Sequence, residues 1–229
     1  MRPLDVRRLG VVPYQEALDL QRTLADERKA DRIPDTLLLL QHPHVLTLGV
    51  KGDGGRSHVL APPARLAELG VQVVETGRGG DVTYHGPGQV VGYPIIDLNP
   101  DRRDVHKYVR DLEEVMIRVS AAFGIAAGRI AGLTGTWIPD TPAGPAKIGA
   151  IGVRISRWVT SHGFAYNVTT DLSFFDLIVP CGIAEHGVTS VAAMTGERPP
   201  IAAVEDLFIR HFAAVFEREA AGQAAGTAR

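Results

Sequence analysis

The sequence predicts an α+β protein with a mixed, largely antiparallel sheet flanked by helices. Amphipathic helical segments and short β-branched runs alternate along the chain. They do not follow the strict strand–helix–strand order of a doubly wound parallel fold, and several strands follow one another directly. A length of 229 residues suits one sizeable domain. We place this domain at residues 1–217 and expect residues 218–229 to form a flexible C-terminal tail.

Helical periodicity is clear in three segments, residues 14–30, 105–123 and 201–217. In each, apolar residues recur three and four positions apart, which gives one face to bury and one to expose. Asp104 is a good N-cap for the second helix, and Gly124 ends it. A further one or two helical turns are predicted at 63–69.

Strands are predicted where β-branched and apolar residues gather between Pro, Gly and Arg. These runs are 36–41, 45–48, 71–76, 90–98, 136–138, 147–156 and 158–169. Residues 78–89, RGGDVTYHGPGQ, contain too many glycines for a regular helix. We therefore expect a shaped loop or hairpin there, suited to a backbone-lined groove for an extended ligand.

The composition excludes several classes of protein. Lys and Arg together number 24 against 26 Asp and Glu, so the net charge of −2 provides no general attraction for nucleic acid or an anionic membrane. Apolar runs such as 37–40 are far shorter than the roughly 20 residues of a membrane-spanning helix. The N-terminus lacks the apolar region of a signal peptide, so a cytoplasmic location is expected.

Cys181 is the single cysteine, which excludes an internal disulfide and a cysteine-based zinc site. It lies in IVPCGI, where the flanking Pro and Gly suit a thiol presented beside backbone amides. The alternative is a small buried side chain, because isolated cysteines in such proteins often only fill space.

Further candidate site residues are Lys147, His162 and the pair His42 and His44. Lys147 opens an apolar strand, where it either faces a cleft or is solvated at the strand end. His162, in SHGFAYN, either orients a partner or hydrogen-bonds a backbone carbonyl. His42 and His44 have no Asp, Glu or Cys at metal-ligand spacing, so no metal site is predicted.

A basic run marks the start of the second helix, with Arg102, Arg103, Lys107 and Arg110. It is either a docking face for an acidic carrier protein or an ordinary solvated face.

Three motifs occur in register. They are RGGDVTYHGPGQ, then AKIGAIGVRISRWVTSHGFAYNV at 146–168, then PCGI followed by VTS at 188–190. In order and spacing, this series resembles the octanoyl-[acyl carrier protein]:protein octanoyltransferases of lipoate biosynthesis. The resemblance runs from about residue 9 to about residue 216. It implies a fold related to the biotin and lipoate protein ligases.

The resemblance also implies the site. Cys181 would carry the acyl group as a thioester, and Lys147 would activate it. His162, from the residues alone, is a further candidate for a supporting role. The acyl pocket would be lined by Arg78, Gly79, Gly80, Asp81, Val82, Thr83, Tyr84, His85, Ala150, Ile151, Gly152, Gly163, Phe164 and Ala165. Asp81 stands where relatives often carry Gln or Lys. Phe164 stands where a smaller apolar residue is common, which predicts a reshaped pocket.

The implied reaction moves an octanoyl group from octanoyl-acyl carrier protein to a lysine of a lipoyl domain. The acceptors would be the acyltransferase subunits of 2-oxoacid dehydrogenases and the glycine cleavage H protein. A thiol with a pKa of about 8.5 is only ~3% thiolate at pH 7, so a nearby lysine is needed to raise that fraction. No cofactor or ATP is expected. The alternative is an ATP-dependent lipoate or biotin protein ligase, which would not need Cys181.

Overall fold

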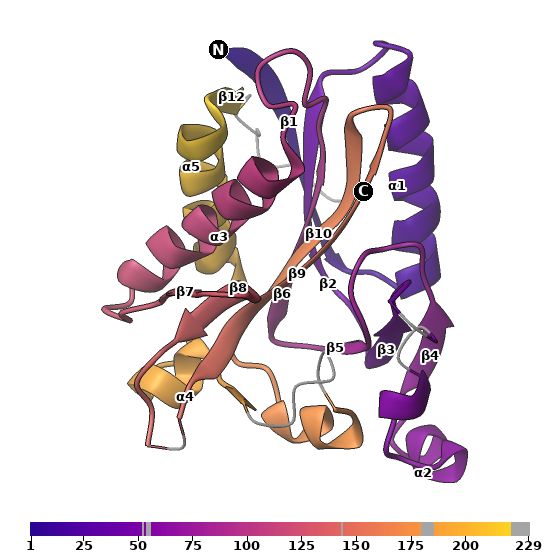
Figure 1. Ribbon diagram of the computed structural model, residues 1–229, viewed down its shortest axis with the longest axis vertical. Coiled ribbons are helices and arrows are strands. Elements are labelled where there is room, and N and C mark those ends of the chain that lie inside the picture. The colour runs from indigo at the N-terminus through magenta and orange to yellow at the C-terminus, as the bar shows by residue number, and fades with distance from the viewer. Residues whose placement is uncertain (52, 54–55, 143, 180–185, 221–229) are drawn as a thin grey trace, which may run out of the picture.

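The computed structural model describes residues 1–220 except 52, 54–55, 143 and 180–185. A large mixed sheet forms its centre, with strands in the order β12-β1-β2-β6-β10-β9-β8-β7 and with β11 beside β9 (Figure 1). The strands are β1 (Arg2–Val11), β2 (Asp35–Gln41), β6 (Gln89–Ile95), β7 (Gly128–Ile130), β8 (Leu133–Ile138), β9 (Ala146–Ser156), β10 (Val159–Asn167), β11 (Gly187–Val188) and β12 (Arg218–Ala220). Strand β1 is parallel to β2 and β12, and β11 is parallel to β9. The other pairs are antiparallel, which confirms the predicted sheet.

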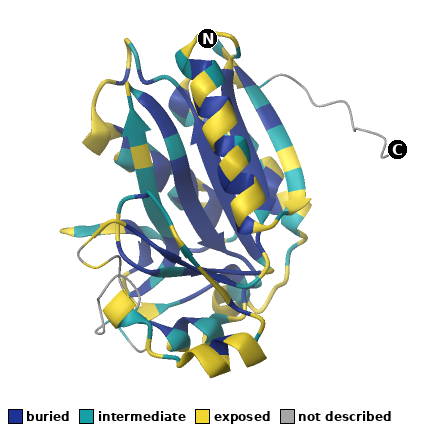
Figure 2. Ribbon diagram, turned by 90° about the vertical axis from the view of Figure 1, so that its right-hand side faces the viewer, coloured by how far each residue is buried: buried dark blue, intermediate teal, exposed yellow. Residues whose placement is uncertain are grey.

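Helices cover both faces of this sheet. Helix α1 (Tyr14–Lys29) packs on one face, while α3 (Val105–Ala121) and α5 (Ile201–Phe216) pack together on the other (Figure 1). Figure 2 shows the exposed stripe of α1 turned away from the buried strands beneath it. Asp104 caps α3 as predicted, accepting a hydrogen bond from the backbone N–H of Lys107 at 3.0 Å. Within the described part of the chain, no helix combines the length and apolar character needed to cross a membrane.

A second, small sheet lies beside the main one, with strands in the order β4-β3-β5. It consists of β3 (Val45–Leu48), β4 (Gln72–Glu75) and β5 (Thr83–His85). Short helices lie near this sheet or near the end of the main sheet: η1 (Arg56–His58), α2 (Pro63–Glu68), η2 (Leu172–Leu177) and α4 (Val191–Thr195). The glycine-rich segment 78–89 thus begins as a loop, at 78–82, that leads into β5. Strand β5 ends in a tight turn, where Gly88 has a φ of +81°, and the chain then enters β6.

The sequence prediction missed five of the described strands, β1, β5, β7, β11 and β12. Leu4 and Val6 are buried at alternate positions of β1, but the many charged residues of this segment obscure the period of two. At the other end, the expected tail does not begin at residue 218. Arg218 is buried and opens strand β12, which pairs with β1, so regular structure includes residues 218–220. Residues 221–229 lie outside the described part.

Candidate active site

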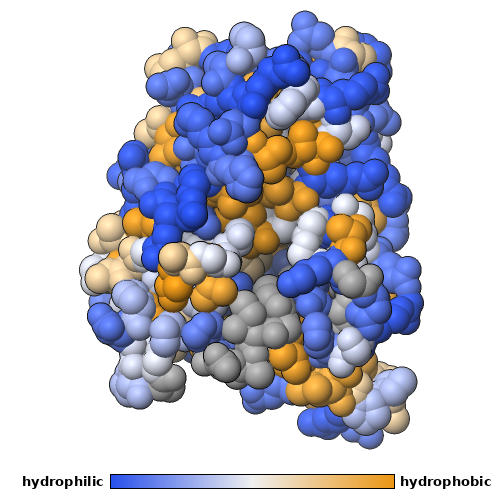
Figure 3. All heavy atoms as spheres, viewed as in Figure 1, coloured by the Kyte–Doolittle hydropathy of each residue, from blue (hydrophilic) through white to orange (hydrophobic). Residues whose placement is uncertain are grey.

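A cavity lies between the β9–β10 hairpin and the loop that leads into β5. Small residues form cross-strand pairs along the hairpin, Ala150 with Ala165 and Gly152 with Gly163, and all four line the cavity. Most of the predicted pocket residues surround it: Arg78, Gly80, Asp81, Thr83, His85, Ala150, Ile151, Gly152, Gly163, Phe164 and Ala165. The candidate supporting residue His162 also lines it. In the same direction of view as Figure 1, apolar side chains gather in the middle of the face, over this hairpin, between hydrophilic flanks (Figure 3).

Three predicted pocket residues do not line this cavity. Val82 and Tyr84 alternate with Thr83 and His85, so their side chains pack in the core of the small sheet. Gly79 lines the neighbouring cavity instead.

Two lining residues, Tyr14 and Tyr93, were missed. The sequence signal that could have identified them is the residue type, because the hydroxyl group of a tyrosine in a buried element needs a hydrogen-bond partner. The Tyr93 hydroxyl donates to Nε2 of His42 at 2.7 Å, and the His42 Nδ1–H donates to the Val12 carbonyl at 2.7 Å.

Arg78 fixes the loop from inside. Its guanidinium donates to the Thr47 carbonyl at 2.6 Å and to the Gly79 carbonyl at 3.0 Å. Glycines allow this close packing: a Cβ at position 49 would lie 2.1 Å from the Gly80 carbonyl oxygen, and one at Gly152 would lie 3.0 Å from Cδ of Arg78. The charged side chain of Arg78 is therefore a fixed part of the cavity wall.

Asp81, one of the two residues that depart from the family pattern, also stabilises the loop. Its carboxylate lies 2.8 Å from Nδ1 of His58 and accepts a hydrogen bond from the backbone N–H of Val82 at 2.6 Å. With its side chain 5% exposed, it ties the loop to the short helix η1.

A buried chain of hydrogen bonds runs behind the cavity. The Nδ1–H of His85 donates to Oε1 of Gln89 at 2.7 Å, and Nε2 of Gln89 donates to Oδ1 of Asn167 at 2.9 Å. Asn167 in turn donates to the Thr189 carbonyl at 3.0 Å, and the Thr189 N–H donates to the carbonyl of Lys147 at 2.9 Å. The chain links the cavity wall to the backbone of the candidate catalytic lysine.

Lys147 lies at one end of the row of small residues. Its ammonium nitrogen is 4.6 Å from the centre of the Trp137 ring, and its backbone pairs with Trp137 in β8 and Val188 in β11. It borders a cavity that shares Thr83, Ala150 and Ala165 with the one described above. Lys147 is therefore held beside the end of the cavity.

Cys181 lies outside the described residues, and so does the PCGI motif around it. The described neighbours of this segment are informative. Before it, the N–H of Val179 donates to the carbonyl of His58, the partner of Asp81, at 2.8 Å. After it, the His186 ring lies 5.5 Å from the ring of Trp137, against which Lys147 packs. Both flanks thus border the candidate site.

The Phe164 ring is accommodated in the core. It stacks on Phe208 of α5 with ring centres 4.8 Å apart. A Cβ at Gly92 would lie 2.1 Å from this ring, so the absence of a side chain there makes the space. Phe164 also lines the cavity, so the reshaped pocket stays a prediction.

The basic run at the start of α3 carries less free charge than the sequence suggests. Arg102 and Lys107 both pair with Asp111, and Arg110 lies 2.8 Å from Glu113. Arg103 packs over the Trp158 ring at 4.8 Å. A docking face built on these residues therefore loses much of its support.

The lowered pKa values of three buried histidines predict how the stability of the fold depends on pH. Burial lowers the pKa of His42 and His162 to about 4 and that of His85 to about 3, against an ordinary value of about 6.5. The unfolded chain therefore binds more protons below pH 6.5, so this contribution to stability is complete above pH 6.5 and is lost as the pH falls towards 4. We expect the free energy of unfolding to fall by about 1.4 kcal/mol per pH unit for each histidine.

Urea unfolding at pH 7, 6 and 5 tests this expectation, since most carboxylates titrate mainly below this range. His85→Gln is expected to reduce the slope, whereas His106→Gln, at an exposed position, leaves it unchanged. A stability that stays constant from pH 6.5 to 5 would contradict the prediction.

Comparisons with known proteins agree with this geometry. The chain is similar in structure to a bi-partite lipoate protein ligase from Thermoplasma acidophilum, with a TM-score of 0.67, 17% identity and coverage of 96% of this chain and 87% of the other. It is also similar to a biotin protein ligase from Aquifex aeolicus in complex with biotin and ATP, with a TM-score of 0.55, 12% identity and coverage of 93% and 70%. The fold therefore defines the class that contains lipoate and biotin protein ligases, as the sequence predicted.

Sequence similarity gives the family. Residues 13–213 match the model of the lipoyl protein ligase A/B catalytic domain. The octanoyltransferase of Chloroflexus aggregans is 51% identical over 218 residues, covering 95% of this chain and 96% of the relative. The chain belongs to this octanoyltransferase family. It is an acyltransferase that transfers octanoyl groups in protein lipoylation.

Proposed function

We propose that this enzyme takes its octanoyl group from the thioester of octanoyl-acyl carrier protein, holds it on Cys181, and passes it to a lysine of a lipoyl domain. The acceptors would be the lipoyl domains of 2-oxoacid dehydrogenase acyltransferase subunits and the glycine cleavage H protein. One relative in fold, the archaeal ligase, is described together with its E2 lipoyl domain. The reaction would take place in the cytoplasm, in a single catalytic domain.

The observation that carries the proposal is the row of small residues that begins beside Lys147. The row is lined by Ala150 and Ala165 and then by Gly152 and Gly163. A narrow apolar channel suits an unbranched acyl chain, because each buried methylene contributes about 0.8 kcal/mol. The thioester carbon would then lie at the Lys147 end, and the methyl end would lie deeper along the hairpin.

In the first half-reaction, the Cys181 thiolate attacks the carbonyl carbon of the octanoyl thioester. The new carbon–sulfur bond forms as the bond to the carrier thiol breaks, and the carrier leaves as a thiol after taking a proton. One thioester replaces another, so no ATP is consumed. The ammonium of Lys147 would stabilise the thiolate and supply the proton to the departing carrier.

In the second half-reaction, the acceptor lysine must be neutral. At an ordinary pKa of about 10.4, only ~0.04% of such amines are free at pH 7. The neutral form of the acceptor amine attacks the carbonyl carbon of the acyl-enzyme. Lys147, neutral after protonating the carrier thiol, is the base that would take the proton that the nitrogen loses as the amide forms, while the carbon–sulfur bond breaks and the Cys181 thiolate is released.

Intact-mass spectrometry tests the route. The protein is mixed with octanoyl-acyl carrier protein without ATP, beside a Cys181→Ala variant. One octanoyl adduct on the wild type alone, lost when a lipoyl domain is added, is the expected result. Lysine octanoylation that requires ATP and free octanoic acid, and that survives in Cys181→Ala, would instead assign the chain to the ATP-dependent ligases.

A further inference from the structure

Three cavities follow one another along the β9–β10 hairpin. The first borders Lys147 and shares Ala150 and Ala165 with the second, which is the proposed acyl cavity. A third cavity, here called the outer cavity, lies between α1 and the far end of the hairpin, with Arg154 and Ser156 on β9. His162 lines both the acyl cavity and the outer cavity. It therefore stands at the boundary between them.

The backbone at His162 is unusual for a strand. Its φ is +56°, a left-handed conformation that costs a non-glycine residue about 1–3 kcal/mol. The surroundings hold it there: the His162 N–H donates to Oε1 of Gln21 at 2.7 Å, and its ring meets Tyr93 edge-on, with centres 6.3 Å apart. His162 as a whole is 4% exposed.

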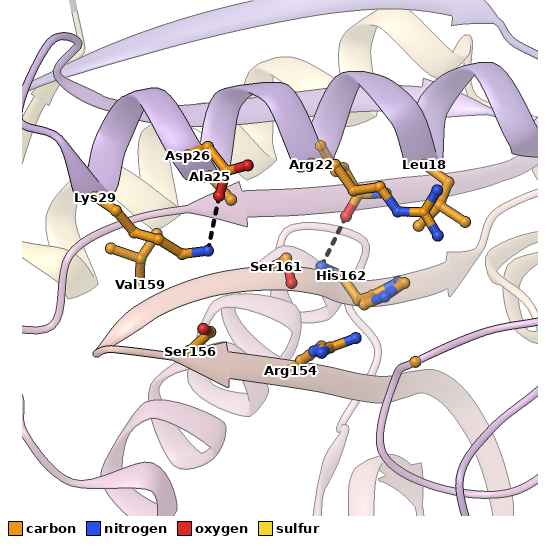
Figure 4. Close-up of a pocket in the computed structure, with 12 residues that line it drawn as sticks. Leu18, Arg22, Ala25, Asp26, Lys29, Arg154, Ser156, Val159, Ser161 and His162 are labelled. Atoms are coloured by element: carbon orange, nitrogen blue, oxygen red, sulfur yellow. Dashed lines mark hydrogen bonds and ion pairs between the residues drawn. The ribbon is translucent and has the colours of Figure 1, made fainter.

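The outer cavity is larger and more polar than the acyl cavity. It has a volume of about 230 Å³, which is several times the roughly 30 Å³ share of one water molecule. Figure 4 shows Arg22 and the Asp26–Lys29 pair on α1 facing Arg154 and His162 on the hairpin. Charged groups surround this space, so burying the methyl end of an acyl chain there is unfavourable. A boundary between the two cavities therefore affects which acyl chains can bind.

We propose that His162 sets the upper limit of acyl-chain length, by closing the deep end of the acyl cavity against the outer cavity. The inference rests on the proposed function, because it takes the second cavity as the acyl pocket. Val153 pairs with His162 six positions after Lys147. The barrier thus lies beside β9 on the far side of the acyl cavity from Lys147.

Burial also keeps the barrier uncharged, because it lowers the pKa of His162 to about 4. The Nδ1 atom of His162 and Nε2 of Gln21 are buried and have no hydrogen-bond partner among the described residues. Replacing the ring therefore breaks no hydrogen bond of its own. Glycine adopts a φ of +56° without strain, so His162→Gly is expected to fold.

The test is the chain-length profile of His162→Gly, measured with octanoyl- and dodecanoyl-acyl carrier protein. One methylene changes the specificity of an apolar pocket by about 10–200-fold, so we expect the dodecanoyl to octanoyl ratio of kcat/KM to rise at least about tenfold. His162→Asn, which tolerates the same φ, is expected to give a smaller rise. Ser161→Ala changes the neighbouring residue of the outer cavity and is the matched control, with no change in the ratio.

A second readout separates this inference from the proposed function. Calorimetry of octanoate and dodecanoate binding needs no transfer chemistry, and His162→Gly should gain affinity for dodecanoate alone. If the wild type transfers nothing but this gain appears, the proposed function fails and the barrier stands. An unchanged ratio in both readouts, or an equal loss for all chain lengths, would overturn the barrier.

Discussion

Lys147→Met is expected to lower the rate of acyl-enzyme formation by about 10²–10⁴-fold, the usual contribution of a general acid or base. Methionine keeps the length and apolar stem of the side chain, so the packing against Trp137 is largely retained. What is lost is the positive charge that would stabilise the Cys181 thiolate and the proton that would pass to the departing carrier. Rapid-quench measurement of the octanoyl adduct with saturating octanoyl-acyl carrier protein gives the rate.

Two further variants separate charge from proton transfer. Lys147→Arg keeps a cation but cannot act as a base, so the second half-reaction should suffer more than the first. Lys51 lines a cavity together with Lys147 but is exposed, so Lys51→Met is the matched control and should leave both rates within about twofold. An unchanged rate of adduct formation in Lys147→Met would remove the lysine from the mechanism.

Asp35→Ala is expected to destabilise the protein by about 3–5 kcal/mol, because it removes the buried carboxylate that two buried arginines share. The Asp35 carboxylate accepts hydrogen bonds from Arg28 on α1 and Arg218 on β12, each at 2.8 Å. The side chains of Asp35 and Arg218 are 1% exposed. This carboxylate joins the first helix, the second strand and the C-terminal strand, and urea unfolding measures its contribution.

Another carboxylate that pairs with Arg28 provides the control for this prediction. Asp31 lies 2.7 Å from Arg28, but its side chain is 90% exposed. An ion pair in water contributes about 0–1 kcal/mol, so Asp31→Ala should be nearly neutral. Equal losses in Asp35→Ala and Asp31→Ala would show that burial does not decide the strength of these pairs.

Local sequence was sufficient for helices α1, α2, α3 and α5 and for most of the described strands. Periods of two and of about 3.6 residues reflect which side chains face the core, and the cap at Asp104 is a local hydrogen bond. The signal failed where charged residues take part in long-range pairs. Arg218 appeared to belong to a polar tail, yet it pairs with Asp35, 183 residues earlier, and no local pattern reports such a contact.

By itself, the sequence determined the fold class, the candidate nucleophile Cys181 and its partner Lys147, and the segments that surround the cavity. Only the tertiary structure decided which residues face that cavity, because alternation turns Tyr84 into the core while Tyr14 arrives from a distant helix. It also showed that His162 borders two cavities at once. The physical reason is that a cavity is enclosed by residues far apart in the chain, whereas a motif records only neighbours along it.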